Sequence, residues 1–338
     1  MFSVLRAAPS LAKIPHKAFL SITGSQTAEF LNGVLATAIR QPLKPGLSTI
    51  LNAQGRVLHD VFLYTQTDEK GKHGYILEYD ARASDAAPLL DVLKRFVLRA
   101  KVKIRDASDQ YESWAAWGSS QAHLEHPRTW QWAQSGCVEP VWDSQAWPWG
   151  SEEGVIHDRR AVGMGKRMLI RKGDKPSEIL DHNLLIDGYT RHRILNGVPE
   201  GIFDIPPTYA LPIESNLDMM GGLDFRKGCY VGQELTVRTY HKGVIRKRIY
   251  PITFEKSSEA TSCSRVTPGC SIKAEGQRRP VGRLLSTDAG HALALLKSEL
   301  IEANTKLTVM DQGDVAWNIT PTIPEWWPTP PPVHIEQE

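Results

Sequence analysis

The sequence contains few cysteines and no long apolar run. Only four of its 338 residues are cysteine, and no two of them have the CxxC spacing of a redox or zinc-binding pair. Disulfide-stapled extracellular domains are much richer in cysteine, so we expect a reducing compartment. A membrane-spanning helix needs about 20 consecutive apolar residues, which no segment approaches. The cysteines are Cys137, Cys229, Cys263 and Cys270.

The sequence also lacks a strong net charge and the common nucleotide and protease motifs. Its 40 Lys and Arg against 38 Asp and Glu give a formal charge of +2, too small to indicate a nucleic-acid partner. No phosphate-binding GxxxxGK[ST], dinucleotide fingerprint or HExxH occurs. His123 and His126 are close together, but only Glu125 accompanies them, which favours a solvated turn over a metal site.

Both ends of the chain have biased compositions. Residues 1–16 form a basic leader with Arg6 and Lys13, and no acidic residue occurs before Glu29. This composition suits the end of a mitochondrial transit peptide, and the alternative is a basic, disordered lead-in. Residues 321–338 have the proline content of a tail.

Hydrophobic periodicity predicts an α+β fold. Helices that interrupt antiparallel strands favour this class over a parallel, doubly wound sheet. The residues from 244 to 320, with turn signals at TPGC, EGQRRP and TDAG, predict a small β-barrel or sandwich. The expected strands span 17–22, 57–64, 74–79 and 101–106. The expected helices span 28–35, 89–97 and 184–197, the last ending at Gly197.

Seven of the ten tryptophans lie between residues 114 and 149. Tryptophans can stack on single-stranded nucleic acid, but such platforms also need a basic groove. Arg128 is the only Lys or Arg in this stretch, so we interpret the tryptophans as core or interface packing.

The residues around Cys229 are the most informative part of the sequence. From 222 to 248 there are seven Lys and Arg residues and His241, against only Asp224 and Glu234. Nearby cations stabilise a thiolate, which is the nucleophilic and metal-binding form of cysteine. Glycines on both sides of the thiol allow a tight turn or the close approach of another molecule. From these residues alone, a buried structural cysteine beside a solvated basic strand remains an alternative.

One thiol cannot hold an iron–sulfur cluster by itself. Such clusters usually have about four protein ligands, and no second cysteine is near Cys229 in the sequence. A cluster at Cys229 would therefore be shared with another chain.

The motif KGCYVGQE resembles the signature of the YgfZ-like family, which is related to the glycine-cleavage aminomethyltransferase. The sequence is similar to the mitochondrial iron–sulfur assembly factor branch of that family. The segments LNAQGRVLHDVFLY, GVPEG and LPIESNLD support the resemblance, which covers most of residues 18–300. The motif residues are Lys227, Gly228, Cys229, Tyr230, Gly232, Gln233 and Glu234.

This resemblance implies a three-domain ring around a central channel, with antiparallel sheets and a C-terminal β-barrel. The expected first domain is discontinuous and carries the motif, and the second is an α+β domain with the tryptophan-rich insertion. The expected ranges are 17–48 with 170–240, 49–169, and 241–320 for the barrel.

The resemblance also implies a channel that binds tetrahydrofolate in the related aminomethyltransferases. Arg193, Glu214 and Asp224 are the residues expected to line it here. Leu195 replaces a carboxylate that would contact the pterin, and an apolar side chain cannot accept the pterin's hydrogen bonds. We expect folate binding to be weak or vestigial. A folate-dependent aminomethyl-type transferase is the alternative function, although a transferase-like fold without turnover is favoured.

The function implied by the resemblance is iron–sulfur cluster assembly in the mitochondrial matrix. The chain would act with A-type assembly proteins in maturing four-iron four-sulfur proteins such as aconitase, lipoate synthase and respiratory-complex subunits. Cys229 would ligate a bridging two-iron two-sulfur cluster, and the isolated chain would be a monomer. Basic residues would steer an acidic partner face: Arg238, His241, Lys242 and Lys247.

Overall fold

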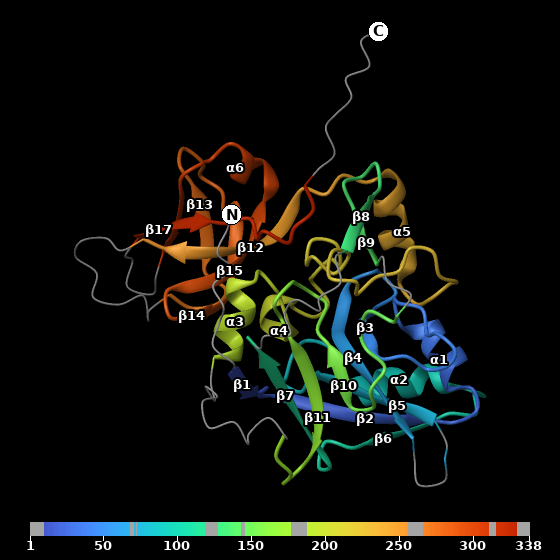
Figure 1. Cartoon of the computed structure of the whole chain (residues 1–338). Helices are drawn as coiled ribbons and strands as arrows, with labels where there is room; N and C mark the ends of the chain where they lie inside the picture. The colour runs from blue at the N-terminus through green and yellow to red at the C-terminus, as the bar shows by residue number, and fades with distance from the viewer. Residues whose placement is uncertain are drawn as a thin grey trace.

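The computed structural model of the chain contains two antiparallel sheets, a closed barrel and a separate hairpin (Figure 1). It describes residues 10–67, 71, 73–118, 128–142, 146–176, 188–255, 266–310 and 316–329. Cys263, His123 and His126 lie outside these ranges, as does the start of the helix expected over 184–197. Within the described residues, no helix is long and apolar enough to cross a membrane.

The first sheet has five strands in the order β3-β4-β5-β2-β6, and two helices cover one of its faces. All the strands and helices expected between residues 17 and 106 are confirmed. The β2–β5 and β3–β4 pairings cross the expected domain boundary between residues 48 and 49, so that boundary cuts a continuous sheet. The elements are β2 (Lys17–Thr23), α1 (Thr27–Val34), β3 (Gly46–Leu51), β4 (Val57–Thr67), β5 (His73–Asp80), α2 (Leu89–Val97) and β6 (Lys103–Asp106).

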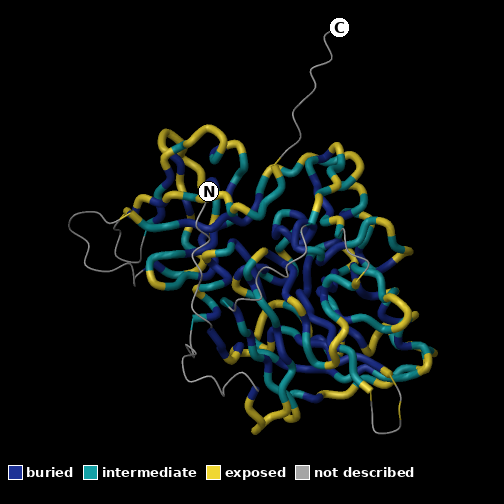
Figure 2. Tube along the Cα trace, in the orientation of Figure 1, coloured by how far each residue is buried: buried dark blue, intermediate teal, exposed yellow. Residues whose placement is uncertain are grey.

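The second sheet packs against the other face of the first. Side chains alternate across a strand, so Leu20 faces α1 and α2 while Phe19 points into the core shared by the two sheets. This core is the dark region between the sheets in Figure 2. The strands are, in sheet order, β1 (Ser10–Lys13), β7 (Tyr111–Trp117), β11 (Lys166–Arg171) and β10 (Val155–His157). β1 lies inside the range expected as a leader.

Short helices lie between the sheets and the barrel in Figure 1. Helix α3 (Tyr189–Leu195) is followed by Gly197, whose φ of 67° is the left-handed conformation of a helix end, as expected. Helix α4 (Gly201–Asp204) follows shortly after Gly197. Both helices contact the barrel strand β14 (Gly282–Asp288).

The C-terminal barrel is confirmed. Its six antiparallel strands close in the order β12-β15-β14-β13-β16-β17 around an apolar interior. Closure leaves no free strand edge. The remaining elements are β12 (Lys247–Phe254), β13 (Ser271–Ala274), β15 (His291–Lys297), α6 (Ser298–Glu302), β16 (Leu307–Met310) and β17 (Ala316–Pro321).

Tryptophans of the stretch between residues 114 and 149 take part in packing, as expected. Trp117 and Trp149 are buried in the core between the sheets. The hairpin of β8 (Arg128–Trp132) and β9 (Val138–Trp142) places the Arg128 guanidinium over the Trp130 ring at 4.7 Å. Arg128, the only Lys or Arg of this stretch, is therefore engaged in packing.

The segment after β17 returns to the body of the protein. Trp326 donates its indole N–H to the Asn196 carbonyl at 2.7 Å, and its ring lies 4.9 Å from the Arg128 guanidinium. Trp327 packs on Tyr250 with ring centroids 5.0 Å apart. The described part of the expected tail thus connects the barrel, α3 and the β8–β9 hairpin.

Candidate functional site

Cys229 lies on an exposed loop that leads into helix α5 (Gln233–Lys242). Its thiol is free, and the neighbouring Gly228 is exposed as well. Tyr230, the next residue, is buried and packs into the core between the sheets. The chain therefore presents the thiol to solvent while it anchors the loop immediately after it.

Lys227 attaches this loop to the end of helix α1. Its Nζ donates hydrogen bonds to three carbonyl oxygens, those of Asn32 at 2.8 Å, Leu35 at 2.5 Å and Thr37 at 3.2 Å. The last carbonyls of a helix have no partner within it and carry partial negative charge, so they favour a cation. Burial lowers the pKa of Lys227 to about 8, against the opposing effect of Asp224.

Two backbone hydrogen bonds hold the loop on either side of Cys229. The Asp224 N–H donates to the Ala36 carbonyl at 2.9 Å, and the Val231 N–H donates to the Gly33 carbonyl at 3.0 Å. Both acceptors belong to α1 or to the segment directly after it. The Cys229 loop is therefore built on the C-terminal end of α1.

The two glycines of the motif have different surroundings. Gly232 has a φ of 80°, and a Cβ there would lie 2.2 Å from the Asn52 carbonyl oxygen, so only glycine fits. A Cβ on Gly228 would meet nothing within 4 Å, so internal packing does not require glycine there. Gly232 makes the turn into α5. At Gly228 the backbone beside the thiol is exposed, because glycine has no side chain to cover it.

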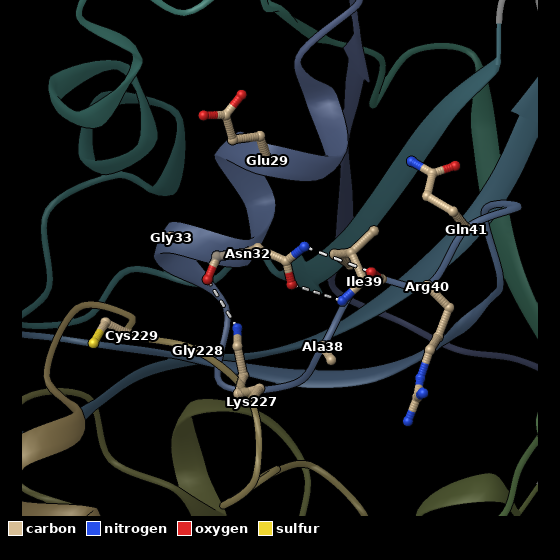
Figure 3. Close-up of a pocket in the computed structure, with 10 residues that line it drawn as sticks. All are labelled: Glu29, Asn32, Gly33, Ala38, Ile39, Arg40, Gln41, Lys227, Gly228 and Cys229. Atoms are coloured by element: carbon tan, nitrogen blue, oxygen red, sulfur yellow. Dashed lines mark hydrogen bonds between the residues drawn. The ribbon is translucent and has the colours of Figure 1, made fainter.

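A pocket of about 590 Å³ opens beside Cys229. Figure 3 shows Cys229 on one side of Lys227 and Arg40 on the other, with Lys227 reaching up to Asn32. Because both glycines in its lining lack side chains, part of the wall is backbone. The lining residues are Glu29, Asn32, Gly33, Ala38, Ile39, Arg40, Gln41, Lys227, Gly228 and Cys229.

The basic residues after the motif lie on a helix, where the sequence indicated a strand. Arg238, His241 and Lys242 are exposed on α5, and Glu234 is exposed in its first turn. The helix forms because Gly232 turns the chain just before it, and the side chain of Gln233 accepts a hydrogen bond from the Tyr230 N–H at 3.1 Å.

Arg246 and Arg248 have different surroundings. Strand β12 begins at Lys247, which is half-buried, so Arg246 precedes the strand and is exposed. Arg248 is buried and donates to both carboxylate oxygens of Asp218, at 2.5 and 2.8 Å. Arg248 is therefore structural, and the exposed basic surface consists of Arg238, His241, Lys242 and Arg246.

The three described thiols have different surroundings. Cys137 is buried and lies 3.2 Å from the Asp218 carboxylate, and burial raises the pKa of its thiol. Cys270 is half-buried beside Thr267 in the barrel. Only Cys229 among these is exposed. In the part of the chain that the structure describes, no group of three or more His, Cys, Asp or Glu side chains could hold a metal ion.

The residues expected to bind folate are not joined by any contact. Arg193 is buried, pairs with the Asp204 carboxylate and donates to Ser286 at 3.1 Å. Asp224 accepts a hydrogen bond from the Arg226 N–H at 2.9 Å, and Glu214 is half-buried. A folate carboxylate at Arg193 would have to displace Asp204, so these contacts do not fit a folate site there.

Tetrahydrofolate should therefore bind weakly. The Arg193 guanidinium is already paired, and Leu195 offers no hydrogen-bond acceptor. We expect isothermal calorimetry with tetrahydrofolate to give a dissociation constant well above about 1 μM, corresponding to a binding free energy weaker than about 8 kcal/mol. Submicromolar affinity would contradict this expectation and support the transferase alternative.

A buried network of charges, which no sequence motif predicted, lies between the two sheets. Glu200 accepts from Lys17 at 2.7 Å, Arg160 at 2.7 Å and Arg167 at 3.0 Å. Burial alone would raise the pKa of Glu200, but Arg167, Lys17 and Arg160 lower it well below 4.5.

Further carboxylates balance this network. Glu78 on β5 pairs with Arg167 on β11, and Asp158 pairs with Arg160 at 2.6 Å. The Tyr189 hydroxyl of α3 donates to Glu200 at 2.5 Å. The network therefore joins both sheets to the segment around α3 and α4.

Comparisons with known proteins identify the fold of this chain and the family of its C-terminal barrel. The glycine cleavage system aminomethyltransferase T from Bartonella henselae has a similar structure, with a TM-score of 0.65 at 15% identity over 94% of this chain and 86% of that one. The fold is thus the aminomethyltransferase-like α+β fold with a C-terminal barrel. Residues 246–329 match the family described as CAF17, C-terminal beta-barrel domain.

Two similar proteins are both named as mitochondrial iron–sulfur cluster assembly factors. The iron–sulfur cluster assembly factor IBA57 homolog, mitochondrial, of Cryptococcus neoformans is 37% identical over 329 residues, covering 88% of this chain and 85% of that protein. The human iron–sulfur cluster assembly factor IBA57, mitochondrial, is 34% identical over 336 residues, covering 96% and 86%. At this identity and coverage, the chain belongs to the IBA57/CAF17 family of iron–sulfur cluster assembly factors.

Proposed function

We propose that this chain matures four-iron four-sulfur proteins in the mitochondrial matrix by acting with an A-type assembly protein. In this proposal Cys229 supplies one thiolate to a two-iron two-sulfur cluster that bridges the two proteins. The cluster is cargo, and the partner supplies the remaining ligands. Aconitase, lipoate synthase and respiratory-complex subunits are the proposed recipients.

The exposed, free thiol of Cys229 is the observation that carries the proposal. A thiolate is a good ligand for iron, but a cluster usually takes about four protein ligands. The described residues offer no group of three ligands anywhere. A single accessible thiol beside an open pocket fits a cluster that is completed by a second protein.

The proposed compartment rests on the relatives and on the N-terminal composition. Both relatives described above are named mitochondrial. Residues 1–9, which precede strand β1, include Arg6 and no acidic residue, a composition that suits the end of a transit peptide. The matrix is the compartment proposed for the partner and the recipients.

A mixing experiment tests the function. The purified chain and an A-type protein loaded with a two-iron two-sulfur cluster would be combined, and visible absorption and native mass would be recorded. We expect a one-to-one complex that contains one cluster. A mixture in which the two proteins stay separate, or associate without a cluster, would contradict the proposal.

The exposed basic residues near Cys229 should speed docking of an acidic partner. Charge complementarity acts mainly on the association rate, and ions at physiological strength screen it within about 8 Å. Replacing Lys242 and Arg246 together by Gln should slow association at low salt and have little effect at high salt, with a nearly constant dissociation rate. Surface plasmon resonance across a salt series would measure this.

The matched control replaces the same number of charges elsewhere. Lys94 and Lys101 are exposed near α2 and outside the proposed docking surface, so changing both to Gln should leave the low-salt association rate near the wild-type value. Equal rates for wild type and the Lys242/Arg246 variant at every salt concentration would place docking elsewhere.

A further inference from the structure

We propose that Lys227 is a positioning residue whose ammonium fixes the Cys229 loop on the C-terminal end of α1, and so sets where the thiol meets the incoming cluster. This inference rests on the proposed role of Cys229. It assigns Lys227 no contact with the cluster itself.

The hydrogen bonds of Lys227 account for all of its donors. An ammonium group has three N–H bonds, and the three carbonyl oxygens of Asn32, Leu35 and Thr37 accept from it. On its other side the ammonium lies 4.9 Å from the centroid of the Tyr230 ring. No donor remains for a ligand in the adjoining pocket, so the contacts support a role in holding the loop.

Helix α1 receives this cation from outside. Its last turn contains no basic residue, and Lys227 donates to the carbonyl of Asn32 in that turn and to that of Leu35 just after it. Lys227 supplies the charge from a point 195 residues beyond Asn32 in the chain. Positive charge at a helix C-terminus is stabilising, and hydrogen bonds from a charged donor are stronger than neutral ones.

The position of Cys229 depends on these attachments. The loop is fixed at Asp224, at Lys227 and at Val231, and Cys229 lies between the second and third points. The Cys229 side chain itself has no hydrogen bond among the described residues. Its location is therefore set by the backbone on either side. Loss of the Lys227 attachment would leave six residues, 225–230, between the backbone hydrogen bonds at Asp224 and Val231.

Replacing Lys227 by Met tests the attachment in the free protein. Met retains most of the aliphatic stem but cannot donate to the three carbonyls. Hydrogen exchange should become about tenfold faster at the Val231 and Asp224 amides, because charged hydrogen bonds are among the stronger ones in proteins. The Leu77 amide, in the centre of the first sheet, should keep its protection. Lys94→Met, which removes an exposed charge from α2, should change none of these rates.

The same variants then enter the mixing experiment. With Lys227→Met we expect less cluster absorption per mole of complex than with wild type or Lys94→Met, at equal folded fractions. Unchanged exchange at Val231 and Asp224, or faster exchange with full cluster content, would overturn the positioning role. If Lys227→Met does not fold, Lys227→Arg takes its place. Arginine retains the charge, but its planar guanidinium cannot donate to all three carbonyls from a single nitrogen. Lys227→Arg should therefore show the same changes in exchange and cluster content to a smaller degree.

The two proposals can fail separately. If wild type itself forms no cluster with the partner, the proposed function fails. The exchange rates of the free protein still show whether Lys227 holds the loop, because they require neither partner nor cluster.

Discussion

Replacing Cys229 by Ser should reduce the cluster absorption of the mixed complex to near the baseline. Serine has almost the same size as cysteine, but a neutral hydroxyl is a far poorer ligand for iron than a thiolate. Cys229 is exposed and makes no side-chain hydrogen bond within the described residues, so the substitution removes no packing. The thermal midpoint should therefore stay at the wild-type value while the visible absorption of the complex is lost.

Cys270 provides the matched control. It is a second free thiol in the barrel, half-buried and close to Thr267. Cys270→Ser should leave the cluster content unchanged. Equal cluster absorption from wild type and Cys229→Ser would remove Cys229 from the ligand set and leave it only a contact role.

Most of the fold could be predicted from the periodicity of apolar residues. The strand at 17–22 and the helices at 28–35 and 89–97 have clear alternation or helical spacing, and the structure has all three. Turn signals at regular intervals indicated the barrel. Domain boundaries are harder to predict because they depend on which strands pair, as the continuous sheet across residues 48 and 49 shows.

The motif at Cys229 was found from its sequence, but its supporting structure was not. Helix α5 has a single fully buried residue, Thr236, so no apolar stripe marks it as a helix. The acceptors of Lys227 lie at Asn32, Leu35 and Thr37, and no local pattern connects them with a lysine almost 200 residues later. Such contacts form only in the folded chain.

The buried charges did leave a signal in the sequence. Glu78 lies within GYILEYD, where a charged residue interrupts a strand of apolar and aromatic residues. Arg167 occupies a similar place in KRMLIR on β11. Charges are seldom fully buried unless they are paired, so a charge on the inward face of a strand predicts a partner on another strand.

Replacing Glu200 by Gln should destabilise the protein by about 3–5 kcal/mol, the usual cost of breaking a buried ion pair by removing one partner. Gln has nearly the same shape, but it carries no charge to compensate Lys17, Arg160 and Arg167. The cations cannot reach water because the network is buried between the sheets. Urea unfolding monitored by circular dichroism would measure the loss.

The pH dependence of this loss identifies its electrostatic origin. The pKa of Glu200 in the folded protein lies well below 4.5, so wild type gains stability from the ionised group at any pH above its unfolded value. The difference between wild type and Glu200→Gln should be constant above about pH 4.5 and shrink as the pH falls below it, since unfolded Glu200 then binds a proton. Glu299 is exposed and pairs with Lys297 at 3.2 Å, so Glu299→Gln should cost less than about 1 kcal/mol. Similar losses for both variants would mean that the network stabilises the protein no more than a surface pair does.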